Sequence, residues 1–548
     1  MFADALLLAT LQIFSQVPVE DFNAANQARY LKDIRDAGIT TVLVSYSDYY
    51  GIGDSRKPYF AKIGREVRYF EEAGLDVRVW CNGFGYGNDR RVGAGKTRFA
   101  NSQNIVSMHG KTSGALCPLD PAMRRLLIEN MRDIAATGVK AILMDDDFIQ
   151  SARGFVGCAC DRHLARVAKK VGHPVTHADM VRAFTGKPNA LRTAFVDVTG
   201  EVAVELAREL RAAVDEVNPQ TRIGLCLSVT HWDLEGVDMD ELLRAFAGET
   251  RPFVRISGAP YWDDARFRGI GLEGVTEFAR MQAQWLQGKG YEIFDENDPY
   301  PRKVKVVPAW RCELYDKATI ADGLMARHKY MLCYGKDRTE PGYIEAHLAN
   351  MKDDRKLAEL FEGAEPYGLR IDFPKRRIRE ATLPAEPLEE RRITELYSQP
   401  LAANLLLRCG IPIRHDDATA SYVFRPEDFG IDVAAVDFAA FKGGDLRKRI
   451  LEDVRRKSGR PLDVYVETAS PRIYQIVRYN AKRSEYAVLL ENMGTKSAEV
   501  KIVTAGTPRI TGSVCGKFAT GPGGVTLADL PAHEFAAVRF ALNDETGK

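Results

Sequence analysis

The sequence carries almost no net charge and no long apolar segment. Its 548 residues contain 76 basic and 75 acidic side chains, which leaves a net charge of +1. This balance gives no indication of nucleic-acid binding or of attraction to an anionic membrane. No run of about 18 uncharged apolar residues occurs, so we expect no transmembrane helix. The apolar start, MFADALLLATLQIF, lacks a basic leader, and we interpret it as a strand rather than a secretory signal.

Several common signatures are also missing. The sequence has no nucleophile elbow, no phosphate loop ending in Lys-Ser/Thr, and no internal repeat. GFGYGN at 83–88 lacks the complete dinucleotide-binding pattern, and we interpret it as a flexible loop. The nine cysteines are odd in number and irregularly spaced, which argues against a disulfide framework and favours reduced thiols in a cytoplasmic protein.

Strand-like apolar runs alternate with amphipathic helical stretches over the first two thirds of the chain. Strands that alternate with helices predict a parallel sheet covered by helices. Eight runs fit a (β/α)8 TIM barrel at 1–375, with the active site where the strands end. The runs are 6–14, 40–48, 76–84, 139–148, 222–229, 253–262, 291–298 and 330–335.

The remaining third of the chain has a different pattern. A charged, proline-containing stretch at 373–392 predicts a linker. Residues 393–470 combine helices and strands and predict a small α/β domain. Residues 471–548 alternate short strands with turns, which is typical of a β-sandwich. The expected fold class is therefore α/β, with a barrel followed by two smaller domains.

Carboxylates follow two of the predicted barrel strands. Asp145, Asp146 and Asp147 end the fourth run, and Glu296 ends the seventh, so both groups should reach the same mouth of the barrel. Two carboxyl groups that face each other across a scissile bond are what glycoside hydrolysis needs. If side chains alternate, Asp145 and Asp147 share a face, and crowding of like charges raises at least one pKa, which suits a general acid. A helix cap, a turn or a metal site would also explain the three aspartates.

A cysteine cluster follows these aspartates. Cys158, Cys160 and His163 form a Cys-x-Cys-x-x-His pattern, and Cys117 precedes it by about forty residues. Four such ligands suit a tetrahedral structural zinc, which would join the loop after the third strand to the loop after the fourth. A catalytic zinc is disfavoured because four protein ligands leave no open position. The alternative is a set of ordinary buried thiols.

Aromatic and polar side chains recur together near the predicted strand ends. Sugar-binding sites combine aromatic platforms with polar groups that hold hydroxyls, so we predict that these residues, with Asp146, bind substrate. Arg302 or Arg311 could bind an anionic sugar, or could pair with Asp298 or Glu313. The pairs are Tyr46 with Asp48, Trp80 with Asn82, His231 with Trp232, Tyr261 with Trp262, and Trp310 with Arg311.

These motifs resemble those of glycoside hydrolase family 42 β-galactosidases. LMDDDF followed by GCACDRH is similar to that family's Asn-Glu-Tyr motif and cysteine cluster, and ALCPLDPAMRR is similar to its Cys-Pro-x-x-Pro segment. The resemblance implies a barrel, a flavodoxin-like trimerisation domain and a small β domain, in that order. Glycoside hydrolase family 164, a family of β-mannosidases with a similar architecture, fits equally well.

The resemblance also implies roles for individual residues. It places Asp147 on the acid/base glutamate, Asp146 on the preceding asparagine and Glu296 on the nucleophile, with Asp145 and Asp295 as alternatives. It implies a retaining exo-glycosidase that acts on β-galactosides or β-mannosides and forms a homotrimer or homodimer. It also implies a structural zinc held by Cys117, Cys158, Cys160 and His163.

Two other functions fit the same residues. One is a divalent-metal isomerase or lyase of the barrel fold, with Asp145, Asp147 and Glu296 as metal ligands. The other is a sugar-binding protein without turnover. Loss of activity on chelation, with metal outside the cysteine cluster, would favour the first. Normal sugar affinity without hydrolysis of any aryl glycoside would favour the second.

Overall fold

The structure is a computed structural model of the chain. Tyr46, Asp48, Cys333 and part of the loop at 83–88 lie outside the described residues. The described residues are 11–19, 22–45, 56–85, 102–151, 154–228, 231–232, 234–263, 271–332, 339–371, 377–390, 392–393, 401–416, 422–438, 440–470 and 472–543.

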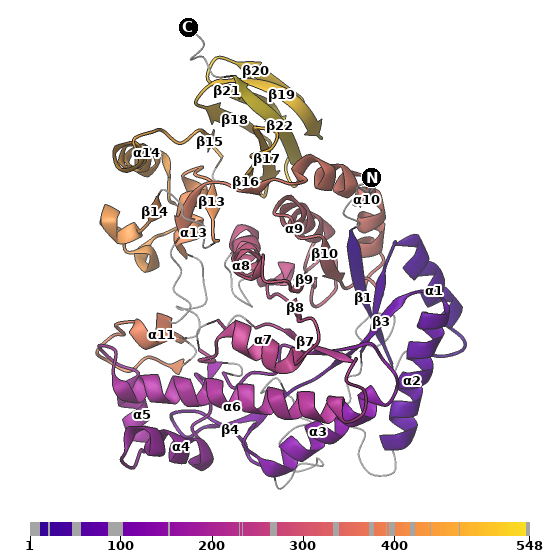
Figure 1. Cartoon of the computed structure of the whole chain (residues 1–548). Coiled ribbons are helices and arrows are strands. Elements are labelled where there is room, and N and C mark those ends of the chain that lie inside the picture. The colour runs from indigo at the N-terminus through magenta and orange to yellow at the C-terminus, as the bar shows by residue number, and fades with distance from the viewer. Residues whose placement is uncertain are drawn as a thin grey trace, which may run out of the picture.

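Eight parallel strands close into a barrel, which confirms the predicted fold (Figure 1). Seven of the eight predicted runs overlap an observed strand, whereas the eighth strand lies just before its predicted run. In order around the barrel the strands are β1 (Gln12–Pro18), β2 (Thr41–Ser45), β3 (Asp76–Cys81), β6 (Ala141–Met144), β7 (Arg222–Cys226), β8 (Phe253–Arg255), β9 (Glu292–Asn297) and β10 (Ala326–Lys329).

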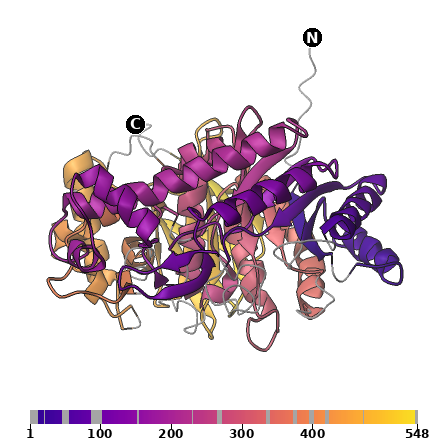
Figure 2. The ribbon, with the colours of Figure 1, turned by 90° about the horizontal axis from the view of Figure 1, so that it is seen from below.

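Helices cover the outside of the barrel and bury their apolar faces against the strands (Figures 1 and 2). The helix α3 shows how such a helix begins. Asp120 caps it by accepting from the backbone N–H of Ala122 and Met123, and Pro121 stands at its first position. The covering helices are α1 (Gln27–Asp36), α2 (Arg56–Glu72), α3 (Pro121–Ala135), α6 (Ala190–Asp215), α7 (Met239–Ala247), α8 (Gly271–Leu286), α9 (Ala309–Ala321) and α10 (Gly342–Phe361).

Two insertions at the third and fourth strands have a hydrophobic core of their own. The first is a hairpin, β4 (Asn104–Val106) and β5 (Thr112–Leu116), which ends just before Cys117. The second contains α4 (Asp161–Val171) and α5 (His177–Ala183). The helices of the second insertion pack on α6, and the two insertions together bring the predicted cysteine cluster to one place.

A small α/β domain packs against α8 of the barrel through α13 (Leu401–Arg408). Its three-stranded parallel sheet has β12 (Leu369–Ile371) between β13 (Ile413–Arg414) and β14 (Val423–Phe424). The central strand comes from before the predicted linker, so this domain uses chain from inside the predicted barrel range. The domain also contains the 3-10 helices η4 (Pro426–Phe429) and η5 (Val433–Ala435) and the helix α14 (Gly444–Ser458). The short helix α11 (Arg377–Glu380) lies instead against α6 (Figure 1).

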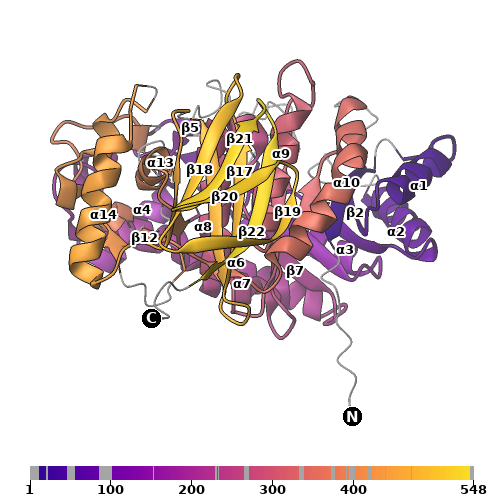
Figure 3. The same cartoon turned by 90° about the horizontal axis from the view of Figure 1, so that it is seen from above.

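The last part of the chain is a β-sandwich that lies against α9 and α10 (Figures 1 and 3). Its two sheets enclose buried apolar side chains such as Val488, Ile502 and Val538. One sheet contains β11 (Glu365–Pro366), β16 (Ile473–Asn480), β17 (Glu485–Asn492), β22 (Phe535–Asn543) and β19 (Thr507–Val514). The other contains β15 (Val464–Glu467), β18 (Ala498–Thr504), β21 (Gly524–Leu530) and β20 (Phe518–Gly521).

Two layers of side chains fill the barrel. The lower layer is apolar and includes Phe14 and Phe294, whose rings stack with centroids 4.4 Å apart. The layer nearer the carboxyl ends of the strands is polar, and it forms the floor of the candidate site. Among the described residues, none of the helices combines the length and the hydrophobicity that crossing a bilayer requires.

Candidate active site

Four charged or titratable side chains form the polar layer. Asp145, Arg255, Glu296 and His328 each follow an interior apolar residue by two positions, and side chains two apart on a strand share a face. They therefore point into the barrel. All four are at most 4% exposed. Burial of so many ionisable groups in one layer is costly unless the charges pair, so this layer is a candidate for function.

Arg255 connects the two predicted carboxylate sites. Its Nη2 lies 3.4 Å from Oδ1 of Asp145 and 3.6 Å from Oε1 of Glu296. Its Nη1 donates a hydrogen bond of 2.8 Å to the hydroxyl of Tyr330, and its guanidinium lies 5.4 Å from the ring centre of Trp80. The carboxylates that end the fourth and seventh strands therefore converge on one guanidinium.

The ionisation of Glu296 is strongly perturbed. Burial raises the pKa of Glu296 to about 8, the positive charge of Arg255 opposes that rise, and the charges of Asp146, Asp298 and Asp145 add to it. Of these three carboxylates, Asp146 makes the largest contribution to the raised pKa of Glu296. Unlike Asp145, it is partly exposed. The same charge of Asp146 acts on Tyr261, whose pKa is raised mainly by burial.

Asp147 has a different environment. Its two carboxylate oxygens accept the backbone N–H groups of Gly83 and Gly85, the latter at 2.9 Å, and its side chain is fully buried. The chain turns after the strand, with Phe148 N–H donating to the carbonyl of Asp145, so the predicted alternation holds to Asp145 and fails beyond it. Asp147 therefore holds the loop after β3 against the loop after β6.

Asp295 faces away from the barrel interior. It lies between β9 and α9, where burial raises its pKa to about 7, Asp316 adds to the rise, and Arg327 and Lys329 oppose it. Its neighbour Glu296 is on the opposite, inward face, because adjacent strand residues alternate. The structure therefore brings Glu296, and not Asp295, to the polar layer.

Three other predicted contacts lie around this layer. Asn82 Nδ2 is 3.5 Å from Oδ2 of Asp145. Trp80 makes edge-on contacts with His328 at 5.4 Å and with Tyr330 at 5.9 Å. Tyr261 makes an edge-on contact with Tyr300 at 5.7 Å, and the charge of Glu296 acts on it. These three predicted side chains therefore lie beside the buried carboxylates.

The predicted pair His231 and Trp232 is buried away from solvent. His231 Nδ1 accepts from Ser228 N–H at 2.6 Å, its Nε2 donates to the carbonyl of Phe148 at 3.1 Å, and burial lowers its pKa to about 4. Trp232 donates from Nε1 to Gln282 at 2.9 Å. The polar atoms of both side chains are therefore satisfied by hydrogen bonds within the protein.

The other predicted rim residues also have partners within the protein. Trp262 is 6% exposed and belongs to the hydrophobic core. Trp310 stacks on His533 of the β-sandwich, with ring centroids 3.9 Å apart. Arg311 pairs with Asp263, at the end of the 3-10 helix η3 (Pro260–Asp263), at 3.1 Å. The last two contacts join the start of α9 to the β-sandwich and to η3.

Two aromatic residues of the polar layer, His328 and Tyr330, were not predicted from the sequence. Both lie on or just after β10, which was expected four residues later, and their rings stack at 4.3 Å. Arg302 was considered for anionic sugars. It instead forms a two-pronged ion pair with Asp298 at 3.2 and 3.0 Å, and it lies 4.9 Å from the ring centre of Tyr330. The position of His328 two residues after the interior Ala326 would have predicted that its side chain points into the barrel.

The predicted metal ligands do come together. The ligand atoms of Cys117, Cys158, Cys160 and His163 all lie within 4.8 Å of one another, and all four residues are buried. Cys117 Sγ is 3.7 Å from Cys160 Sγ and 3.9 Å from Cys158 Sγ. His163 Nδ1 is 3.3 Å from Cys160 Sγ and 3.6 Å from Cys117 Sγ. The cluster could hold a metal ion with its four side chains.

A second acidic group lies outside the barrel wall, between β10 and the helices α9 and α10. It contains Glu313, Asp316 and Asp354, all buried. The amine of Lys329 contacts Glu313 at 3.0 Å and also Asp316, and the amine of Lys317 contacts Asp354. Arg327 adds a third positive charge, 3.9 Å from Asp316 and 4.0 Å from Asp354. Three basic side chains therefore balance the three carboxylates, and we interpret the group as an internal ion network.

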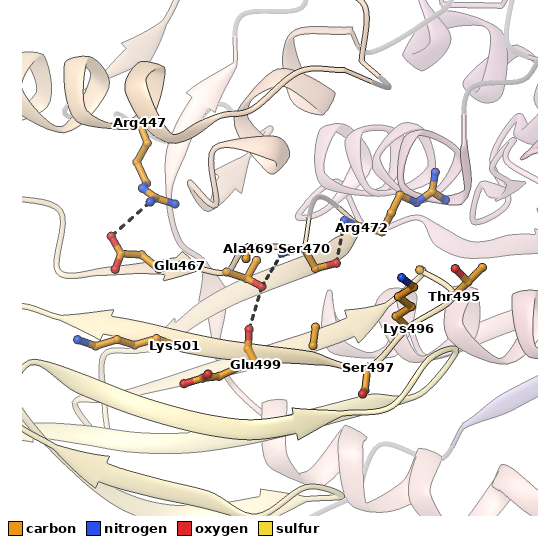
Figure 4. Close-up of a pocket in the computed structure, with 13 residues that line it drawn as sticks. Arg447, Glu467, Ala469, Ser470, Arg472, Thr495, Lys496, Ser497, Glu499 and Lys501 are labelled. Atoms are coloured by element: carbon orange, nitrogen blue, oxygen red, sulfur yellow. Dashed lines mark hydrogen bonds and ion pairs between the residues drawn. The ribbon is translucent and has the colours of Figure 1, made fainter.

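A surface depression of about 730 Å3 lies at the junction of the α/β domain and the β-sandwich (Figure 4). Its side chains bind one another: Arg447 pairs with Glu467 at 3.4 Å, and Thr468 donates to the carbonyl of Glu499. Ser470 Oγ accepts from the backbone of Arg472. Among the described residues that line it, none pairs a nucleophile with a base, and we assign no chemistry to this depression.

The chain resembles known proteins in structure but not in sequence. No protein-family model matches the sequence, and no curated protein sequence matches it. Solved structures do match along almost the entire chain. The β-galactosidase from Bacillus circulans sp. alkalophilus has a TM-score of 0.62 at 10% identity, covering 97% of this chain and 99% of that one.

Two further structures agree with this result. The β-galactosidase from the psychrophilic Marinomonas ef1 has a TM-score of 0.58 at 10% identity and covers 97% of this chain and 100% of that chain. The α-L-fucosidase isoenzyme 2 from Paenibacillus thiaminolyticus has a TM-score of 0.56 at 11% identity, with the same coverage. The chain therefore shares its fold, a closed parallel barrel followed by further domains, with these proteins.

Proposed function

We propose that the chain is a retaining glycoside hydrolase with Glu296 as nucleophile and Asp146 as acid/base. The observation that carries this proposal is the convergence of carboxylates from the fourth and seventh barrel strands, where one guanidinium contacts both Asp145 and Glu296. Two facing carboxyl groups are the requirement of glycoside hydrolysis. The shared fold with β-galactosidases adds support.

The acid/base role goes to Asp146 and not to Asp147 on physical grounds. Both carboxylate oxygens of Asp147 accept backbone N–H groups, so neither is available to a leaving group without the loss of a hydrogen bond. Asp146 is partly exposed, and its charge acts on Glu296 and Tyr261. The family motif then fits one residue earlier, with Asp145 at the position of the asparagine.

The residues suggest a double displacement. Glu296 would attack the anomeric carbon while Asp146 protonates the departing oxygen, which leaves a glycosyl ester on Glu296. Asp146 would then take a proton from water as that water attacks the ester. Arg255 would favour the ionised form of Glu296, because its positive charge lowers the pKa that burial raises. Trp80 and Tyr261 would provide aromatic faces for the sugar ring.

The substrate class we propose is a β-galactoside or β-mannoside, cleaved from the end of a chain. The motif resemblance supports it, and the solved β-galactosidases share the fold. The rival of a divalent-metal isomerase is less well supported. Arg255 already lies between Asp145 and Glu296, where such an ion would need to bind.

The experiment is an array of aryl glycosides hydrolysed by the wild type and by Glu296→Ala. We expect the variant to lose nearly all turnover, and azide to restore part of it by forming a glycosyl azide of inverted configuration. Wild-type turnover in the variant would reject Glu296 as nucleophile. Sugar binding without hydrolysis of any aryl glycoside by the wild type would reject the enzyme class.

For the cysteine cluster we propose a structural zinc. Tetrahedral zinc with Zn–S of ~2.3 Å and Zn–N of ~2.0 Å places two sulfurs ~3.8 Å apart and a sulfur and a nitrogen ~3.5 Å apart. The corresponding distances are 3.7 and 3.9 Å for sulfur pairs, and 3.3 and 3.6 Å for sulfur–nitrogen pairs. When bound, zinc would pin the loop after β5 to the start of α4.

We also propose a homo-oligomer, a trimer or a dimer, in the cytoplasm. The trimer rests on the family resemblance, and light scattering coupled to size-exclusion chromatography tests it. The location rests on cysteine chemistry, since the eight cysteines in the described part of the chain form no disulfide.

A further inference from the structure

The loop that carries the aspartates also touches the cysteine cluster. It runs from Asp145 at the end of β6 to Ser151, and Gln150 near its end is fully buried. Oε1 of Gln150 lies 2.7 Å from Nε2 of His163, the predicted fourth metal ligand. A single side chain therefore links the proposed catalytic loop to the proposed zinc site.

The hydrogen bonds of Gln150 define which way its amide points. Its Nε2 donates to the carbonyl of Thr199 on α6 at 2.7 Å, so its Oε1 is the atom that faces the imidazole. An oxygen acceptor requires Nε2 of His163 to carry the proton. Nδ1 then presents its lone pair to Cys117 and Cys160, as metal ligation needs.

The same loop is held at three further points. His231 donates to the carbonyl of Phe148 at 3.1 Å. The carboxylate of Glu235 accepts the backbone N–H groups of Gln150 and Ser151 at 3.0 and 2.6 Å. All these groups are buried, so the loop has few alternative positions while they stay bonded.

We propose that Gln150 is a positioning residue that couples the Cys117–Cys158–Cys160–His163 metal site to the loop bearing Asp145 and Asp146. It orients His163 for the metal, and the bound metal in turn keeps Gln150, and with it the loop, in place. The coupling to catalysis rests on the proposed hydrolase function, whereas the orientation of His163 does not.

The first test measures metal affinity without any substrate. Gln150→Leu removes the acceptor, and zinc affinity measured by competition with a chromophoric chelator should fall by about 10–100-fold. Gln150→Glu keeps an acceptor oxygen and should retain affinity within a few-fold of the wild type. Gln475→Leu, at a buried glutamine of the β-sandwich, is the matched control and should not change it. Unchanged affinity in Gln150→Leu would overturn the proposal.

A second pair of variants tests whether Gln150 acts through the imidazole of His163. In His163→Cys a thiolate replaces the ring, and a thiolate has no tautomer to select. Adding Gln150→Leu to this variant should therefore cost no further zinc affinity. Cobalt substitution reports the ligand set, since the sulfur-to-cobalt absorption should strengthen with the additional thiolate. An equal loss of affinity in both backgrounds would show that Gln150 does not act through His163.

The third test addresses the loop. Hydrogen exchange of the backbone amides at 145–151 should be faster in metal-free wild type and in Gln150→Leu than in the zinc-loaded wild type. Protection independent of metal would overturn the coupling. This measurement needs no turnover, so it still decides the proposal if the wild type hydrolyses no glycoside.

Leaving groups provide the catalytic readout. The dinitrophenolate leaving group departs from its glycoside without being protonated, whereas phenolate departs only with help from the general acid. If metal loss displaces Asp146, kcat/KM, which reports formation of the glycosyl-enzyme, should fall at least tenfold more for the phenyl than for the dinitrophenyl substrate. Equal losses on both substrates would assign the metal to overall stability alone and would overturn the coupling to catalysis.

Discussion

Asp146 and Asp147 are neighbours in the chain, yet the same substitution should affect them in opposite ways. Asp147→Asn replaces one of two charged acceptors of backbone N–H groups by an amide NH2, which faces a second donor. Hydrogen bonds to a charged group contribute about 1.5–3 kcal/mol each. Loss of one bond and weakening of the other should therefore cost about 2–4 kcal/mol of stability.

Asp146→Asn should have the reverse profile. The residue is partly exposed, so stability should change by about 0.5 kcal/mol or less. Loss of a general acid/base should lower kcat about 10²–10⁴-fold for a phenyl glycoside. A dinitrophenyl glycoside should still form the glycosyl-enzyme, and azide should speed its breakdown.

The assay compares the two variants side by side. Thermal and urea unfolding report stability, and steady-state kinetics on the two aryl substrates report the acid/base role. Because the chain has several domains, unfolding is followed by probes of the barrel and not by a single midpoint. If Asp147→Asn were stable and lost only the phenyl substrate while Asp146→Asn hydrolysed both, our assignment would be reversed.

Three further outcomes are expected. The pKa of Glu296 is raised to about 8, and a nucleophile must be ionised, so kcat/KM should fall as the pH drops through about 8; a limb near pH 4.5 would contradict this. The folded-state pKa of His231 is lowered to about 4, so its contribution to stability is complete above its unfolded pKa of about 6.5 and is lost as the pH falls towards 4. His231→Gln should flatten the fall of Tm over that interval, and an unchanged slope would refute the reasoning. Metal analysis of protein purified without chelators should find about one zinc per chain, and chelation should lower Tm; metal-free protein of unchanged Tm would reject the site.

The local pattern of the sequence was enough to predict the barrel and the place of its site. Alternation of apolar strands with amphipathic helices has few compact solutions, and in a parallel barrel the strand ends meet at one mouth. That topology alone brought Asp145 and Glu296 together across about 150 residues of chain. The types and spacing of the four ligands were likewise enough to predict the cysteine cluster. The end of a hairpin and the start of a helix can present such ligands through local structure alone.

Only the tertiary structure decided what each polar side chain does. The strand β10 was not predicted because its buried Arg327 and Lys329 make it look polar. Acids of α9 and α10 compensate these charges, and that compensation cannot be seen in a short window of sequence. The turn after β6 places Asp147 where it accepts backbone N–H groups. His231 is bonded to the carbonyl of Phe148 within the protein. The strand period determines faces only while the strand lasts, and beyond its end the role of a side chain depends on which distant groups satisfy its hydrogen bonds and charge.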